Sequence, residues 1–150
     1  MQRSWSLYRT SPCFAFALCL CTLFAGCHSN GELLIPVEGV VTLDGQPLTS
    51  GAISFRPTQG NLTLHHPTGS IEPNGRFQLY VGSRAGAPPG FYKVVIFANE
   101  EQADERGVHP GMPKTLIDRR YNAPQTTPLS AEIAPQMQSA SFDFDLEPAA

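Results

Sequence analysis

Proline and glycine residues divide this chain into short segments, and their spacing constrains the fold more than any other feature of the sequence. The chain contains 14 prolines and 13 glycines, most of them between runs of β-branched and aromatic residues. Proline removes a backbone hydrogen-bond donor and glycine lowers helix propensity, so this spacing opposes long helices. We therefore expect a β-rich fold with frequent turns.

Seven short runs have the composition or the alternation of β-strands. In the clearest of them, Phe77, Leu79 and Val81 alternate with polar residues, and Asn74-Gly75 before them is a tight-turn signal. The pattern predicts an all-β fold, an antiparallel two-sheet β-sandwich. The predicted strands are residues 37–43, 52–55, 68–72, 76–81, 91–98, 129–133 and 141–146.

One long connection separates the last two strands from the others. It covers residues 99–128, and we expect it to be a loop, with a helical turn near residues 100–105 as an alternative. Its acidic run predicts a solvated surface.

The first 26 residues have the features of a secretory signal peptide. Arg3 and Arg9 precede an apolar run over residues 12–25, and small residues follow. The run is shorter than the ~20 residues of a membrane-spanning helix, although an uncleaved anchor or a buried helix is the alternative. Cleavage would remove the only tryptophan, Trp5. It would also remove two of the 10 basic residues and none of the 13 acidic ones, leaving a net charge of −5.

The four cysteines all lie within the first 27 residues, so they do not form the scattered set of a disulfide scaffold. Phe24-Ala25-Gly26-Cys27 resembles the lipobox of bacterial lipoproteins. This resemblance implies cleavage before Cys27, a diacylglycerol on its sulfur and an acylated tether over residues 27–36. The domain would then cover residues 37–150. His28 replaces the aspartate that retains such proteins at the inner membrane, which favours the periplasmic face of the outer membrane over the inner one.

Five segments in this order resemble small lipoproteins of planctomycete-type bacteria with a carboxypeptidase-regulatory-like, or transthyretin-like, domain. They are "VEGVVTLDGQPLTSGAISFRP", "GSIEPNGRFQL", "GAPPGFYKVVI", "RRYNAPQTTPLSAEI" and "FDFDL". The resemblance implies an Ig-like or transthyretin-like sandwich with Greek-key connections. It implies a fold and a location but no reaction. In such a sandwich Tyr92 is expected to pack its ring and to bond its hydroxyl to the backbone.

The residues favour a non-catalytic binding or structural module of the cell envelope. An acidic domain is unsuited to neutralising phosphates, so we expect no nucleic-acid partner. We find no nucleophile elbow, no phosphate-binding loop and no metal-ligand spacing, so we predict no cofactor, no metal and no catalytic residues. The alternative is a small hydrolase or metal-dependent enzyme that uses His65 or His66, together with His109 and the nearby acids.

The candidate contact surface is the one locally basic patch, within residues 99–128. We expect it to bind an envelope protein or a glycan, because loops on rigid sandwiches often carry recognition. The alternative is that Arg119 and Arg120 pair with acids of the same loop. The candidate ligand-binding residues are Lys114, Arg119, Arg120 and Tyr121.

Acidic residues near the C-terminus allow a second hypothesis. Asp143 and Asp145 share one strand face, and with Glu147 they could hold Ca²⁺ loosely. The sequence favours a solvated outer face instead, because no calcium-binding loop accompanies them.

Overall fold

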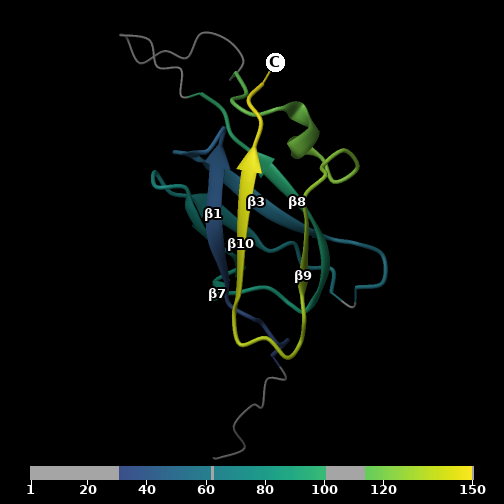
Figure 1. Ribbon diagram of the computed structural model, residues 1–150. Coiled ribbons are helices and arrows are strands. Elements are labelled where there is room, and N and C mark those ends of the chain that lie inside the picture. The colour runs from purple at the N-terminus through teal and green to yellow at the C-terminus, as the bar shows by residue number, and fades with distance from the viewer. Residues whose placement is uncertain (1–30, 62, 101–113, 150) are drawn as a thin grey trace, which may run out of the picture. The chain divides into compact units, whose positions relative to one another are not determined.

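The computed structural model describes residues 31–61, 63–100 and 114–149, and Glu32–Ala150 form one compact unit. Figure 1 shows a unit built from β-strands with one short helix, which confirms the predicted all-β fold class. Cys27, His109 and residues 101–105 of the expected helical turn lie outside the described residues. The strands are β1 (Val37–Leu43), β2 (Gln46–Pro47), β3 (Gly51–Pro57), β4 (Thr68–Ile71), β5 (Arg76–Gln78), β6 (Tyr80–Val81), β7 (Arg84–Ala85), β8 (Gly90–Phe97), β9 (Ser130–Ile133) and β10 (Ala140–Leu146), and the 3-10 helix is η1 (Arg119–Asn122).

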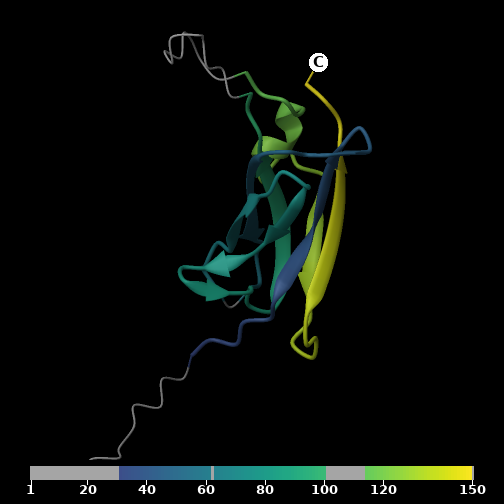
Figure 2. The same ribbon diagram turned by 90° about the vertical axis from the view of Figure 1, so that its left-hand side faces the viewer.

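The strands form one continuous sheet that curls until one end packs over its middle (Figure 2). Its order is β10-β1-β5-β4-β3-β8-β9, with β2 beside β1, β6 beside β4, and β7 beside β6. β10 packs over β3, where the ring centroids of Phe55 and Phe142 lie 5.8 Å apart. The curl gives the sheet two facing parts, here called its two walls: β10 and β1 form one, and β4, β3, β8 and β9 form the other. β5 joins the two walls, because it pairs with both β1 and β4.

One strand pair contradicts the prediction of an antiparallel sheet. β1 and β10 run parallel, with Val37 opposite Ala140 and Leu43 opposite Leu146. β9 and β10 are separated only by residues 134–139, yet they lie at opposite ends of the sheet order. Side-chain alternation predicts which face a strand buries but not which strand it pairs with. The partner and direction of β10 therefore could not be predicted from its sequence.

The predicted strand 76–81 is divided at Leu79, whose amide donates to the Val37 carbonyl oxygen at 3.0 Å. Phe77 and Leu79 are buried as predicted, whereas Val81 is half-buried. β2 and β7 are additional strands that the sequence did not predict. Each has two residues, which is too short for an alternating pattern.

Two predicted turns have the backbone that their residues favour. Gly75 has a φ of 80°, and the side-chain oxygen of Asn74 accepts from the Arg76 amide at 2.9 Å. Asp44 and Gly45, between β1 and β2, have φ values of 51° and 75°. Positive φ at both positions is typical of the tight hairpin turns that match strand twist.

Aromatic side chains fill the centre of the core, between the two walls. Phe55 of β3 has no exposed surface, and its ring centroid lies 5.7 Å from that of Tyr92. The ring centroid of Phe144, on β10, is 6.5 Å from that of Phe55. The Tyr92 hydroxyl donates to the Pro88 carbonyl oxygen at 2.7 Å, as predicted. These contacts tie β3, β8 and β10 together.

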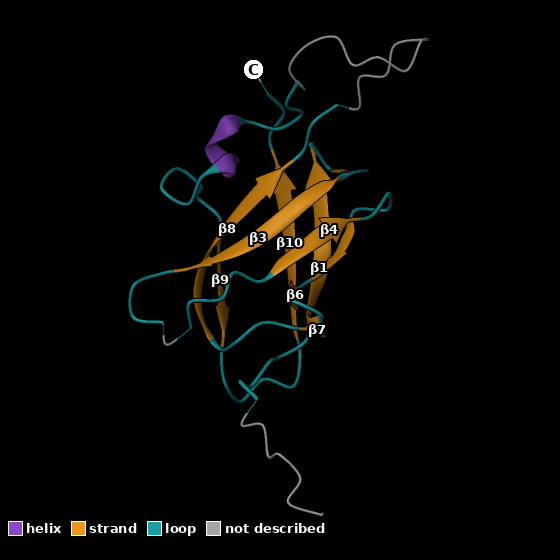
Figure 3. Cartoon of the chain, turned by 180° about the vertical axis from the view of Figure 1, so that it is seen from behind, coloured by secondary structure: helices purple, strands orange, loops and turns teal. Residues whose placement is uncertain are grey.

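The N-terminal residues of this unit and its helix lie at opposite ends of the strands (Figure 1). At one end, Ile35 forms a β-bridge with Ala87. At the other, residues 114–128, here called the η1 segment, lie against β8 (Figure 3). Val95 points away from the core cluster but is only 1% exposed.

None of the described residues belongs to a helix long and apolar enough to cross a membrane.

Candidate functional site

The η1 segment is fastened to the domain by backbone and side-chain contacts along its length. Thr115 forms a β-bridge with Asn99 and Ile117 forms one with Pro148, and Ile117 is fully buried. Farther along, the Thr127 hydroxyl donates to the Val94 carbonyl oxygen at 2.7 Å. The predicted loop is therefore a docked layer over the end of the sheet in the part that the structure describes.

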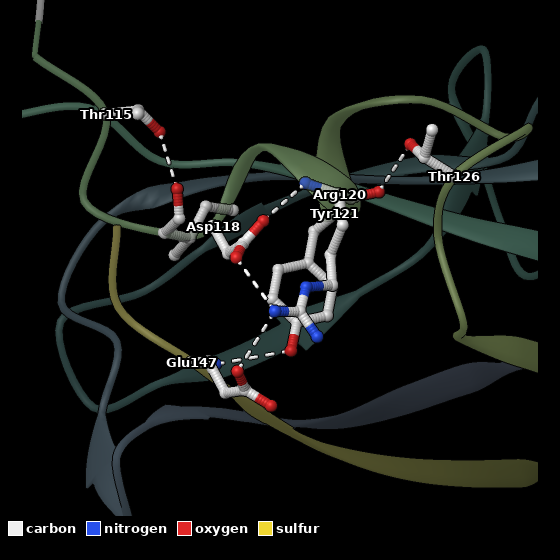
Figure 4. A network of polar contacts seen from close by, with 7 residues as sticks. Thr115, Asp118, Arg120, Tyr121, Thr126 and Glu147 are labelled. Carbon is white, nitrogen blue, oxygen red and sulfur yellow. Dashed lines mark hydrogen bonds and ion pairs between the residues drawn. The ribbon is translucent and has the colours of Figure 1, made fainter. Parts of the chain in front are cut away.

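An ion-pair network holds η1 against the C-terminal residues (Figure 4). Arg120 Nη2 lies 2.9 Å from a carboxylate oxygen of Asp118 and 3.1 Å from one of Glu147. The Arg120 amide also donates to Asp118, which caps the helix, at 2.8 Å. These hydrogen bonds from Arg120 lower the pKa of Asp118. The Tyr121 side chain is buried, and its hydroxyl oxygen accepts from the Glu147 amide at 3.3 Å.

The four predicted binding residues fall into two groups. Lys114 and Arg119 line an open groove of about 780 Å³, here called the terminal groove, together with Asn99, Thr115, Asp118 and Asn122. Arg120 and Tyr121 instead make the contacts that dock η1. The expected pairing with a loop acid is thus found for Arg120, whereas Arg119 makes no ion pair within the described residues. Binding by these residues stays a prediction.

A second groove was not predicted from the sequence. It has a volume of about 670 Å³ and lies between the η1 segment and the residues that follow β3. We call it the basic groove and define it by Arg56, His66, Lys93, Phe97, Asn122 and Gln125. Arg56 and Lys93 each lie within an ordinary strand pattern, and only the register of β3 against β8 brings them opposite each other. The single sequence signal was one basic residue on the outward face of each strand, and on β8 that residue, Lys93, lies between apolar neighbours.

The two grooves meet at Asn122, which lines both of them. Of the seven Lys and Arg residues that the structure describes, four line one groove or the other. They are Arg56, Lys93, Lys114 and Arg119. The side-chain oxygen of Asn122 is buried and accepts no hydrogen bond. A buried acceptor without a donor is unfavourable in a protein interior, and this oxygen has too little exposed surface for a ligand in either groove to reach it.

The histidines that could support an enzyme do not come together in the described residues. His65 Nε2 lies 3.5 Å from a carboxylate oxygen of Glu32, whereas His66 Nδ1 lies 2.6 Å from Arg56 Nη1. His109 lies outside the described residues. In the part of the chain that the structure describes, no group of three or more His, Cys, Asp or Glu side chains could hold a metal ion.

The acidic side chains of β10 hydrogen-bond to β1. An oxygen of Asp143 accepts from the Val40 amide at 3.1 Å. Asp145 accepts from the Thr42 hydroxyl at 2.6 Å and from the Gly45 amide at 3.1 Å. These hydrogen bonds lower the pKa of Asp145. The outward-facing side chains that suggested a calcium site thus support the parallel strand pair.

Comparisons with known proteins give distant structural similarity only. No family model and no curated protein matches the sequence. The chain is similar to a 9R-lipoxygenase from Cyanothece PCC8801, with 14% identity and a TM-score of 0.37 over 78% of this chain and 16% of that one. It is also similar to BcpA, the major pilin subunit of Bacillus cereus, with 12% identity and a TM-score of 0.42 over 77% of this chain and 30% of that one. The chain therefore spans less than a third of either of these proteins.

Proposed function

We propose that this protein is a non-catalytic binding module of the cell envelope, anchored to a membrane by a lipid on Cys27. The observation that carries the proposal is the gathering of basic side chains. Four of the seven Lys and Arg residues that the structure describes line two adjoining grooves, although the chain after residue 26 has a net charge of −5. Such a local excess of positive charge attracts an anionic partner and orients its approach.

The position of the grooves suits a protein held at its N-terminal side. Glu32 is only five positions after Cys27, and a chain of that length spans at most about 18 Å. A lipid on Cys27 would keep the end of the domain that contains Ile35 near the membrane. The η1 segment lies at the opposite end of the strands (Figure 1), so the terminal groove would face away from the lipid.

Two variants of the full-length protein test the proposal in intact cells. Cys27→Ala is expected to abolish incorporation of a labelled fatty acid into the protein, because residue 27 then has no sulfur to carry the diacylglycerol. A variant with alanine at the four basic groove residues, Arg56, Lys93, Lys114 and Arg119, is expected to remain in the membrane. It should lose the envelope components that crosslink to the wild type and are identified by mass spectrometry.

A matched control removes positive charge elsewhere on the domain. Arg76 and Arg84 line neither groove, so Arg76→Ala with Arg84→Ala should keep the wild-type crosslinks. Unchanged crosslinks in the four-alanine variant would show that the grooves are not the contact surface. Fatty-acid labelling of Cys27→Ala equal to that of the wild type would contradict lipid anchoring independently of the binding result.

A further inference from the structure

Two positive charges face each other across the basic groove. Arg56 and Lys93 are direct cross-strand partners in β3 and β8, and both side chains point away from the core. Like charges in this arrangement destabilise a sheet. Within the described residues, no carboxylate oxygen lies within 4.0 Å of either charged group. The acid on the neighbouring strand, Glu132, is opposite Phe91 rather than Lys93.

The neighbours of this pair do not neutralise its charge. Arg56 Nη1 lies 2.6 Å from His66 Nδ1. A guanidinium group can only donate, so this ring nitrogen accepts and the ring carries no compensating negative charge. Lys93 Nζ lies 3.4 Å from the Thr127 carbonyl oxygen. Both cations therefore retain donors for an anionic group, and the Arg56 fork matches a carboxylate or a sulfate.

The rest of the groove offers groups that a small anion would not need. Phe97 is 44% exposed and supplies an apolar ring surface at the groove. The Gln125 side chain is exposed at the groove, and its amide can both donate and accept hydrogen bonds. An aromatic surface with a few polar groups is typical of ligand clefts, and the volume of about 670 Å³ lies within their usual range of roughly 300–1,000 Å³.

We propose that the basic groove binds an anionic glycan, a polysaccharide segment that carries carboxylate or sulfate groups. Arg56 and Lys93 bind the charged group, the ring of Phe97 lies against an apolar sugar face, and the Gln125 side-chain oxygen accepts from a hydroxyl. An acidic peptide has carboxylates but offers no row of hydroxyl donors. Nucleic acid is disfavoured by the net charge of −5 after residue 26. The inference rests on the proposed function and specifies its ligand.

The test measures binding of the full-length protein, purified in detergent, to four polymers by affinity electrophoresis. Polygalacturonate carries carboxylates, dextran sulfate carries sulfates, unmodified dextran is neutral, and polyglutamate is acidic without sugars. We expect binding to polygalacturonate, dextran sulfate or both, and which of them binds identifies the charged group. Binding to neutral dextran or polyglutamate should be at least about tenfold weaker, because each lacks one of the two features that the groove recognises.

Variants then assign the binding to the groove. Arg56→Gln with Lys93→Gln should weaken binding to the anionic glycan by about tenfold or more, whereas Arg76→Gln with Arg84→Gln should change it less than about twofold. Thermal melting by circular dichroism verifies that each variant is folded.

An aromatic pair provides the second matched comparison. Phe97→Ala should weaken glycan binding. Phe91→Ala, on the same face of β8 but outside the groove, should not.

Three results would overturn the inference. They are equal binding to polyglutamate, equal binding to neutral dextran, and unchanged glycan binding in the Arg56/Lys93 variant. If no glycan binds while the crosslinks in cells still depend on the groove residues, the ligand is wrong but the proposed binding function stands. If those crosslinks are also independent of the groove, both proposals fail.

Discussion

At the scale of single residues, the buried hydroxyl of Tyr92 makes the stability of the folded domain depend on alkaline pH. Tyr92 is 1% exposed, and its hydroxyl donates to the Pro88 carbonyl oxygen. Burial, with a smaller effect from the charge of Glu32, raises the pKa of Tyr92 to about 12. The folded state therefore holds the phenolic proton more tightly than the unfolded state does. The stability from this group is complete below about pH 10 and is lost as the pH rises toward about 12.

Tyr92→Phe tests this residue. The variant leaves the Pro88 carbonyl without its donor, so its free energy of unfolding at pH 7 should fall by about 1–3 kcal/mol. Between pH 10 and 12 the wild type should lose stability more steeply than the variant, and the two urea midpoints should converge. Urea unfolding followed by circular dichroism measures both effects. Parallel pH profiles for the two proteins would contradict the assignment.

The hydrogen bonds from Arg120 to Asp118 make the stability of the domain depend on acidic pH. Its hydrogen bonds lower the pKa of Asp118, so their contribution to stability is present above the ordinary aspartate pKa and is lost as the pH falls through the lowered value. Arg120→Gln should reduce the urea midpoint at pH 7, and the difference from wild type should shrink as the carboxylate is protonated. Arg119→Gln is the matched control, since Arg119 makes no ion pair among the described residues. An equal effect in both variants would exclude the network as the cause.

At the scale of elements, Phe55 connects the two walls of the curled sheet. It lies on β3, and its ring contacts Tyr92 on β8 and both Phe142 and Phe144 on β10. Phe55→Ala should lower the free energy of unfolding by about 3–5 kcal/mol, because the walls cannot close a cavity of that size. Phe91→Ala is the control, since Phe91 is 57% exposed and its loss should cost little.

A double-mutant cycle extends this test to the contact between β3 and β10. Phe55→Ala and Phe142→Ala should be non-additive, with a coupling energy of about 0.5–1.5 kcal/mol, because the two rings touch. Additive effects in chemical denaturation would mean that the two walls are stabilised independently.

At the scale of the whole molecule, the predicted lipobox implies that the first 26 residues are absent from the mature protein. Cleavage before Cys27 would remove Trp5, the only tryptophan. Protein isolated from the membrane fraction should therefore show tyrosine but no tryptophan fluorescence, and Cys27→Ala should retain tryptophan emission if cleavage requires the lipidated cysteine. Tryptophan emission from the wild-type membrane protein would contradict signal removal.

Much of the architecture could be predicted from local sequence. Alternation located most of the strands and their buried faces, because a strand in a half-buried sheet shows a period of two. Gly45 and Gly75 marked turns, since glycine adopts positive φ without steric cost. The parallel pairing of β1 with β10 was beyond this reasoning, and so was the division of strand 76–81 at Leu79. Both depend on contacts between residues that are distant in the sequence.

The same division applies to the candidate site. The sequence by itself determined the all-β fold. It also predicted an anchor at Cys27 and a binding role for the basic residues near η1, and both stay predictions. Only the tertiary structure decided that Arg120 docks the helix while Arg119 remains at a groove, because Glu147 approaches from another part of the chain. It also decided that Arg56 and Lys93 form one basic site. They are 37 positions apart in the sequence, and the register of two strands, which no local pattern encodes, makes them neighbours.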